Sequence, residues 1–350
     1  MKAQAPLEPE YVIRAVRGGD LAGYVALREL AGPGFTSLMI EDAAFAKRIA
    51  AAEASFASDV SAPGAERYML ALEHLQSGAL CGSAAVRATV GASPPFFNFR
   101  VLTIAQASAA ADRRFDMSVL ILVNEFTGCS EVGSLFLRPE HRKSGVGRAL
   151  AQARYMLIAA APQRFNERLV SEMRGVVAAD GTSPFWEALG AHFFKMSFRE
   201  ADQLSATTDN QFILDLMPKY PIYADLLPAP ARAAIGVCHP DGAGARKLLE
   251  WEGFRYDHVV DIFDGGPLLT VSRDAVRTKR EAGLKRLVAD ASPPRPVSAL
   301  VATPETKGFR CVSVGAAVRG DEARVHPKAI AALGLDNGAE ALVWASSNES

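Results

Sequence analysis

The sequence predicts an α+β fold with mixed central sheets, built as two consecutive halves and a small C-terminal β-rich module. The first observation is the order of elements: strand, two helices, antiparallel strands, a long strand, a glycine turn with a helix, then strand, helix, strand. The second is a helix followed by a glycine and an aromatic residue, which occurs at Phe185–Phe193 and again at Ala245–Phe254. The third is the proline-rich stretch Ser292–Pro296, which separates a last segment with strand patterns.

Length and composition fit an ordinary enzyme with about two domains. The chain has 350 residues, of which 49% are hydrophobic and 22% charged, and its formal net charge is −1. Because the net charge is close to zero, the protein has no overall positive electrostatic field that would attract nucleic acid. The N-terminus lacks the apolar core of a signal peptide, and no apolar run is long enough to span a bilayer. The cysteines form no C-x-x-C pair, so we expect a reducing cytoplasm and no metal site.

The first elements are a strand, two helices and a strand pair. Asp20 can cap the helix that follows the first strand, and Ser77-Gly78 makes the turn between the paired strands. The expected ranges are a strand at Tyr11–Val16, helices at Leu21–Leu30 and Glu41–Phe56, and strands at Tyr68–His74 and Leu80–Thr89.

Further strands and a short helix follow. Ser183 is a good helix cap and Pro184 fits the first helical turn, so a helix begins there and ends at Gly190. The remaining strands are expected at Phe96–Ala107, Val119–Val123, Val132–Leu137, Leu169–Val177 and His192–Phe198.

The stretch from Glu131 to Ala161 is central to the functional prediction. After the strand comes Arg142-Lys143-Ser144-Gly145-Val146-Gly147, and then an amphipathic helix. Glycines allow main-chain N–H groups to converge, and the helix dipole and basic side chains add positive charge there. This predicts a pyrophosphate site. The spacing R-x-x-G-x-G between a strand and a helix is similar to the acyl-CoA motif of the GNAT acyltransferases; an ordinary basic turn is the alternative.

These elements predict tandem GNAT-like halves, with domains at residues 11–200, 201–290 and 297–350. The second half has its own strand at Asp257–Phe263 but no second R-x-x-G-x-G, so one donor site is expected per chain. Val276–Arg286 reads as a basic helix whose charges are solvated rather than bound to nucleic acid. The last module should contain strands near Phe309–Val314 and Ala341–Trp344 and a helix at His326–Leu333, with no catalytic feature.

Several stretches together resemble the arginine N-succinyltransferase family, from roughly Val12 to the C-terminus. One departure is His141, where the family often has an aromatic residue, and a short N-terminal extension is another. The stretches that carry the resemblance are GPGFTSL, FFNFRV, TGCSEVGSLFL, FNERLVSEMRGV, SPFWEALGAHFF, LMPKYPIY, GVCHP and EGFRYDHVVDIFDGGP.

The resemblance implies an acyltransferase of arginine catabolism, which transfers the succinyl group of succinyl-CoA to the α-amino group of L-arginine. Succinyl-CoA is then a co-substrate, and no resident cofactor is expected. Some organisms have paired paralogous subunits acting on arginine and ornithine. An ornithine-preferring enzyme, an acetyl-CoA donor, a homo- or hetero-oligomer and a non-catalytic partner subunit therefore remain alternatives. No membrane or nucleic-acid partner is expected.

The donor contacts follow from the resemblance and from the loop. The family's succinyl-CoA contact in S-E-x-x-x-L-F-L falls on Leu135, whose strand can pair with the pantetheine arm as an added strand would. The side chain of Leu135 is then ordinary core. The expected donor-binding residues are Leu135, Phe136, Leu137, Arg142, Lys143, Gly145 and Gly147.

His239 is the expected catalytic residue, because the family's proton donor in G-x-x-H-P falls on it. An imidazole can donate a proton near neutral pH to the departing thiolate. The alternative is a loop histidine that only caps the next helix. Cys238 is a poor nucleophile candidate, because adjacent residues rarely face each other and direct attack by the amine needs no covalent intermediate.

Charged residues near these motifs are candidates for holding the substrates. Arg100 and Arg174 could bind the carboxylate of the amino acid or of the succinyl group. Glu131 and Glu172 could bind the guanidinium or deprotonate the amine. A structural ion pair is the alternative for each of them. Thr36 and Ser37 could also reach the substrate, or cap a helix.

Overall fold

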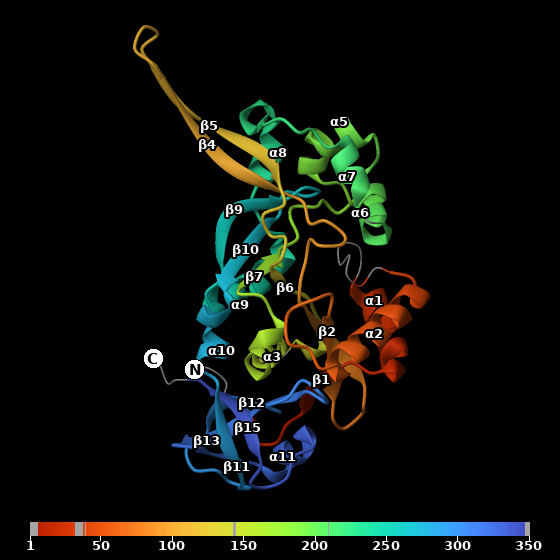
Figure 1. Cartoon of the computed structure of the whole chain (residues 1–350), viewed down its shortest axis with the longest axis vertical. Coiled ribbons are helices and arrows are strands. Elements are labelled where there is room, and N and C mark those ends of the chain that lie inside the picture. The colour runs from red at the N-terminus through yellow and green to blue at the C-terminus, as the bar shows by residue number, and fades with distance from the viewer. Residues whose placement is uncertain (1–5, 32–37, 39, 143–144, 209, 347–350) are drawn as a thin grey trace. The chain divides into compact units, whose positions relative to one another are not determined.

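The fold, seen in a computed structural model, is mixed α+β and divides into two compact units (Figure 1). The structure describes residues 6–31, 38, 40–142, 145–208 and 210–346. Unit 1 comprises residues 1–88, 132–167 and 272–350, and unit 2 comprises residues 89–131 and 168–271. Both units are discontinuous in sequence, whereas the sequence-based division has three consecutive segments, which stays a prediction.

Unit 1 contains a sheet with the strand order β13-β1-β2-β3-β6, in which Ile13 of β1 lies opposite Leu72 of β2. The side chains of Tyr24, Phe45 and Met69 share a core in which α1 and α2 cover one face of this sheet. Its elements before the C-terminal strands are β1 (Tyr11–Ala15), α1 (Leu21–Ala31), α2 (Asp42–Ala57), β2 (Arg67–His74), β3 (Leu80–Arg87), β6 (Ser130–Leu137, whose first two residues belong to unit 2), α3 (Val146–Ala160) and α10 (Arg277–Glu281).

The last strands of unit 1 close into a ring, because β11 pairs with β14 and β15 while β12 pairs with β13 and β15, and β13 pairs with β14. A closed ring leaves no strand edge exposed, and alternating valine and alanine side chains fill it. Its elements are β11 (Gly283–Ala289), β12 (Val297–Ala302), β13 (Arg310–Arg319), β14 (Glu322–Val325), α11 (Pro327–Leu333) and β15 (Glu340–Ala345).

Unit 2 contains a sheet with the strand order β7-β10-β9-β4-β5-β8. Phe99, Phe185 and Trp186 are fully buried in its core, where the short helices pack on one face. Its elements are β4 (Asn98–Ser108), β5 (Arg113–Val123), β7 (Arg168–Glu172), α4 (Pro184–Ala188), α5 (Gly190–Phe194), α6 (Phe198–Thr207), α7 (Gln211–Leu216), β8 (Ile222–Tyr223), α8 (Ala229–Ala234), α9 (Ala243–Glu252), β9 (Arg255–Asp261) and β10 (Pro267–Ser272).

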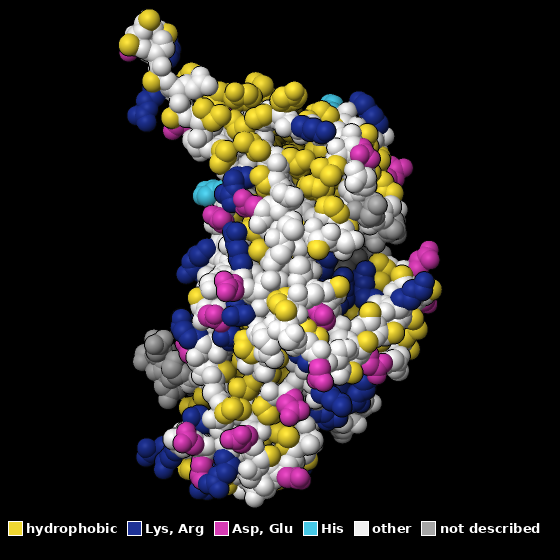
Figure 2. Space-filling model, in the orientation of Figure 1, with side chains coloured by type: hydrophobic (Ala, Val, Ile, Leu, Met, Phe, Trp, Pro, Cys, Tyr) yellow, Lys and Arg dark blue, Asp and Glu magenta, His cyan; other side chains and the backbone are white. Residues whose placement is uncertain are grey.

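Strands β4 and β5 form a long hairpin that extends beyond the rest of unit 2 (Figure 1). Leu102, Ile104, Phe115 and Met117 lie on one face of this ladder, because Ile104 is opposite Met117 and side chains alternate along each strand. Leu102, Ile104 and Phe115 are exposed. Hydrophobic side chains also gather on the surface around the base of the hairpin (Figure 2). The hairpin thus carries an apolar face.

The structure corrects two predicted elements. The strand predicted at His192–Phe198 is instead helix α5 and the start of α6. Phe194 packs on Trp186, and Ser197 with Glu200 forms a capping box that begins α6, a signal the strand prediction overlooked. The basic helix predicted at Val276–Arg286 ends at Glu281, and β11 follows, because ring pairing with β15 overrides the helical pattern.

The other predicted elements are present, with differences at their ends. Strand β5 begins at Arg113 rather than Val119, β7 ends at Glu172 rather than Val177, and β13 continues to Arg319. Within the described part of the chain, no helix combines the length and apolarity needed to cross a membrane.

In unit 2, the backbone around Gly175 lies close to the turn that contains Asp264 and Gly266. The carboxylate of Asp264 accepts hydrogen bonds from the N–H of Gly175 through Oδ2 (2.7 Å) and from the N–H of Gly266 through Oδ1 (2.8 Å). A Cβ on Gly175 would lie 2.6 Å from Oδ1 of Asp264 and 2.7 Å from the nitrogen of Gly266. The contact therefore requires glycine at position 175.

We expect Gly175→Ala to lower the free energy of unfolding by about 1–3 kcal/mol, because backbone atoms would have to move. Denaturant titration measures this. Gly244→Ala is the control, since Gly244 lies inside α9 with nothing within 4 Å of the added Cβ. It should be neutral or stabilise by about 0.5–1 kcal/mol. Equal stability of the two variants would contradict the role of the close approach.

Candidate active site

The predicted phosphate loop has the expected strand–turn–helix form. Gly145 caps α3 with φ 90°, a left-handed conformation that favours glycine. Helix α3 has 15 residues, and its first N–H groups face the same end as Gly145. Gly147 lies in the first turn without a positive φ. The exposed Arg142 donates through Nε to the carbonyl of Leu137 (3.2 Å), and Lys143 lies outside the described residues.

Strand β6 leads into this loop and is irregular. It pairs in parallel with β7 where Ser130 lies opposite Leu169 and Glu131 opposite Val170. Ser134 then has φ 51°, which is a strained conformation for a residue other than glycine. Phe136 is buried in the core under α1 and α2, whereas Leu135 and Leu137 are partly exposed. The irregular backbone therefore lies directly before the predicted donor contacts.

His239 caps the short 3₁₀ helix η5 (Pro240–Gly242), as expected for a loop histidine that caps the next helix. Its ring nitrogen Nδ1 accepts the backbone N–H of Asp241 (3.2 Å), and the backbone N–H of His239 donates to the carbonyl of Arg174 (2.8 Å). Because Nδ1 accepts a hydrogen bond, we assign the proton of the neutral ring to Nε2. The side chain is 19% exposed. The cap therefore uses Nδ1 and leaves Nε2 outside its hydrogen bonds.

A group of carboxyls lies in the same unit around Glu172. Burial is the main cause that raises the pKa of Glu172 well above its ordinary value, followed by the charge and hydrogen bond of Asp261. Glu131 and Asp264 add smaller contributions in the same direction. Oδ1 of Asp261 accepts the N–H groups of Phe263 (2.7 Å) and of Asp264 (2.9 Å). Sequence reasoning found Glu131 and Glu172 but missed the two aspartates.

Three further polar residues belong to this region. Burial and the charge of Asp261 raise the pKa of Asp202 on α6 to about 6, while Arg174 acts in the opposite direction. Nε of Arg174 is buried and has no hydrogen-bond partner among the described residues. Asn98 is 0% exposed, and neither of its side-chain amide atoms has a partner in the part of the chain that the structure describes. Asn98 lies opposite Asp261 in the β4–β9 pair, so their side chains share a face of the sheet.

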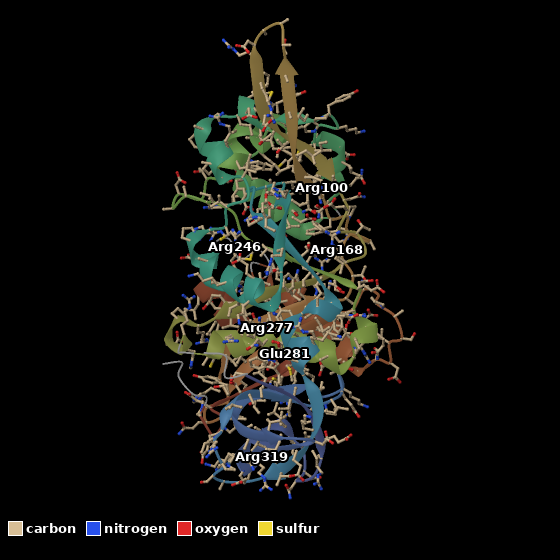
Figure 3. The ribbon with its side chains drawn as sticks, turned by 90° about the vertical axis from the view of Figure 1, so that its left-hand side faces the viewer. Arg100, Arg168, Arg246, Arg277, Glu281 and Arg319 are labelled. Carbon is tan, nitrogen blue, oxygen red and sulfur yellow. The ribbon has the colours of Figure 1, made fainter. Side chains whose placement is uncertain are left out.

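Arg100 lies in a different environment from the other candidates. It pairs with Glu125 and with Asp257, whose Oδ2 lies 3.4 Å away, and Arg168 contacts the same carboxylate at 3.3 Å. Figure 3 shows Arg100 and Arg168 on one side of unit 2. Arg100 therefore forms a structural ion pair, which is the alternative to a substrate-binding role. Thr36 and Ser37 lie outside the described residues.

The arrangement in unit 2 combines the groups needed for amine chemistry. The backbone bond from the N–H of His239 to the carbonyl of Arg174 joins the loop of His239 to the segment after β7, and Glu172 lies two residues before Arg174 on the chain. Carboxyls whose pKa values are raised by burial and by one another are stabilised by a cation. Among the described residues, no group of three His, Cys, Asp or Glu has the arrangement of a metal site.

Comparison with known proteins identifies the family. The family model AstA, arginine N-succinyltransferase beta subunit, matches residues 11–278. The chain is 42% identical over 305 residues to the arginine N-succinyltransferase of Enterobacter sp. (strain 638), covering 87% of this chain and 88% of that protein. It is also 42% identical over 307 residues to the enzyme of the same name from Salmonella arizonae, covering 87% and 89%.

A solved structure extends this similarity to the fold. Subunit AI of arginine/ornithine succinyltransferase from Pseudomonas aeruginosa superposes with a TM-score of 0.86 at 31% identity. The match covers 97% of this chain and all of that subunit. The chain belongs to the arginine N-succinyltransferase family.

Proposed function

We propose that this protein transfers the succinyl group of succinyl-CoA to the α-amino group of L-arginine. The observation that carries this proposal is the main-chain bond that ties the loop of His239 to Arg174, two residues after the buried carboxyl of Glu172, in a chain of this family. The test is release of CoA from succinyl-CoA by the purified protein in the presence of L-arginine, with the product identified by mass. Turnover on another amine and none on arginine would contradict it.

The donor is held by β6 and by the start of α3. The N–H groups around Gly145 and the helix dipole attract the pyrophosphate, and Arg142 adds charge. The pantetheine arm lies along the backbone of Leu135, Phe136 and Leu137 as an added strand would. Gly147 keeps the first turn of α3 open, and Lys143 is proposed from its sequence position alone. Succinyl-CoA is consumed as a co-substrate, and no resident cofactor is needed.

The reaction is a direct displacement. The neutral amine attacks the thioester carbonyl, the carbon–nitrogen bond forms and the carbon–sulfur bond breaks. The attacking nitrogen loses one proton to solvent, and the departing thiolate takes one. The protonated imidazole of His239 supplies that second proton through Nε2, and the neutral ring that remains is reprotonated by solvent. Cys238, next to His239 in the chain, has no part in this scheme.

The acceptor is held by the polar groups of unit 2. Glu172 and Asp261 bind the guanidinium of arginine, and the buried amide of Asn98, which has no partner among the described residues, bonds to the same substrate. Arg174 binds the α-carboxylate through the Nε that is otherwise unpartnered. Glu131 adds negative charge to the same group. Arg100, engaged with Glu125 and Asp257, is the less supported candidate for a carboxylate.

An ornithine-preferring enzyme is the second candidate, because the Pseudomonas aeruginosa relative is named for both amino acids. Comparing rates with arginine, ornithine and lysine separates the two. A paralogous, non-catalytic subunit would show no turnover alone.

The division into tandem GNAT-like halves is also a proposal. Its support is helix α9, which ends at Gly253-Phe254 directly before β9. We propose the cytoplasm as its location, because all the cysteines are free thiols.

Association with a second copy or with a paralogous subunit is part of the proposal. Its support is the apolar face of the β4–β5 hairpin, on which Leu102, Ile104 and Phe115 are exposed. A two-stranded ribbon with such a face is marginally stable in water unless something packs against it. The Pseudomonas aeruginosa relative is itself named as a subunit.

We expect His239→Ala to lower kcat by about 10²–10⁴, because the thiolate would leave without a positioned proton donor. Binding of succinyl-CoA, measured by calorimetry, should be unchanged. The control is His192→Ala, since His192 is exposed on α5 and lies outside the proposed site. Unchanged kcat in His239→Ala would rule out the proton-donor role.

Glu172→Gln should raise KM for arginine about tenfold or more, since a charged partner of the guanidinium is lost. The unliganded variant should melt at a higher temperature at pH 8. A carboxyl with a raised folded pKa contributes stability below its unfolded pKa, and this is lost as pH rises through the folded pKa. The gain should vanish near pH 4. Exposed Glu187→Gln is the control. Loss of both affinity and stability at pH 8 would indicate a structural role instead.

Phe115→Glu should weaken association about tenfold or more, because it places a charge on the apolar face of the hairpin. Light scattering across a range of concentrations measures the mass. Arg114→Glu is the control, because Arg114 lies on the opposite face of the same ladder. A wild-type protein that stays monomeric at every concentration and with a paralogue present would contradict the association.

A further inference from the structure

An open pocket in unit 1 reaches β6 and carries two arginines. Its walls include Arg48 of α2, Arg67 of β2, Ser83 of β3 and Ser134 of β6. Met69 and two alanines make part of the lining apolar. None of the described residues that line it is acidic. The lining therefore suits a small anionic group carried on a short apolar chain.

The positive charge of this pocket follows from strand register. Arg67 lies directly opposite Arg87 in the β2–β3 pair, so both side chains are on the face of the sheet that α1 and α2 cover. Arg48 reaches the same region from α2, and burial and the charge of Arg87 lower its pKa. Guanidinium groups gathered in this way favour a carboxylate, because each presents a planar fork of N–H donors.

The pocket meets β6 at its strained residue. Ser134 has φ 51°, and Oγ of Ser83 donates to the carbonyl of Ser134 (3.1 Å). Strained backbone of this kind is found where a ligand must be approached closely. Ser134 directly precedes Leu135, the proposed donor contact, so the pocket lies beside the strand that takes the acyl end of the donor.

We propose that Arg48 and Arg67 bind the terminal carboxylate of the donor's acyl group. This inference rests on the proposed function, because it takes β6 as the strand that holds the thioester end of the donor. Only two methylene groups separate the carboxylate of a succinyl group from the thioester carbonyl. A carboxylate held in this pocket would therefore leave the carbonyl beside β6, and an acetyl group would gain nothing from the arginines.

The test is binding of succinyl-CoA and acetyl-CoA to the full-length protein by calorimetry, without an acceptor. In Arg48→Gln and Arg67→Gln, succinyl-CoA should bind about tenfold to a hundredfold more weakly, because a charged hydrogen-bond donor is lost. Acetyl-CoA should bind as in the wild type, and Arg67→Lys should recover part of the loss. Arg319→Gln is the control, since Arg319 is exposed on β13 at the far end of the same unit (Figure 3).

The outcomes separate the sources of the carboxylate. Unchanged succinyl-CoA binding, or an equal loss for both donors, would overturn the proposal. A raised KM for arginine with unchanged donor binding would also overturn it and assign the pocket to the carboxylate of the amino acid. Because binding is measured without turnover, a protein that prefers succinyl-CoA through these arginines but never acylates arginine would support the pocket and contradict the proposed function.

Discussion

The carboxylate of Asp264 is the contact on which the arrangement in unit 2 depends. It accepts the N–H groups of Gly175 and Gly266, and so ties the segment after β7 to the turn between β9 and β10. The segment after β7 also receives the N–H of His239 at the carbonyl of Arg174. The buried side chain of Asp264 and the backbone bond of His239 thus both hold the segment that follows Glu172. Burial and the charge of Asp261 raise the pKa of Asp264 well above its ordinary value, although the two N–H groups oppose this.

The charges of the two units match the charges of the proposed substrates. Unit 1 gathers arginines around a pocket without acidic lining among its described residues, which suits the dicarboxylic donor. Unit 2 gathers carboxyls around Glu172, which suits a cationic side chain. The carboxyl cluster is unfavourable by itself, because like charges in a buried site repel and lose hydration. A cationic ligand reduces both penalties, so the same carboxyls that cost stability supply selectivity.

Much of the fold and part of the candidate site could be predicted from the sequence. The features that could not be predicted depend on contacts between distant parts of the chain. The phosphate loop was predicted because Gly145 acts locally, through a backbone conformation that few other residues adopt. The cluster around Glu172 could not be completed, because Asn98 and Asp261 become neighbours only through β4–β9 pairing. The ring of β11 to β15 explains why the helix predicted through Arg286 ends early, since distant strand partners override a local helical pattern. Ser197 and Glu200, by contrast, carried a local capping signal that the strand prediction did not use.

His239 shows why two readings of a residue need not exclude each other. The sequence allowed either a helix cap or a proton donor, and these were treated as alternatives. An imidazole has two nitrogens, however, and the cap uses only Nδ1 together with the backbone N–H. Holding Nδ1 as an acceptor also fixes the tautomer, because a neutral ring must then carry its proton on Nε2. A cap of this kind orients the ring and leaves Nε2 outside the hydrogen bonds of the cap. The structural role is therefore the condition that allows the proposed catalytic one.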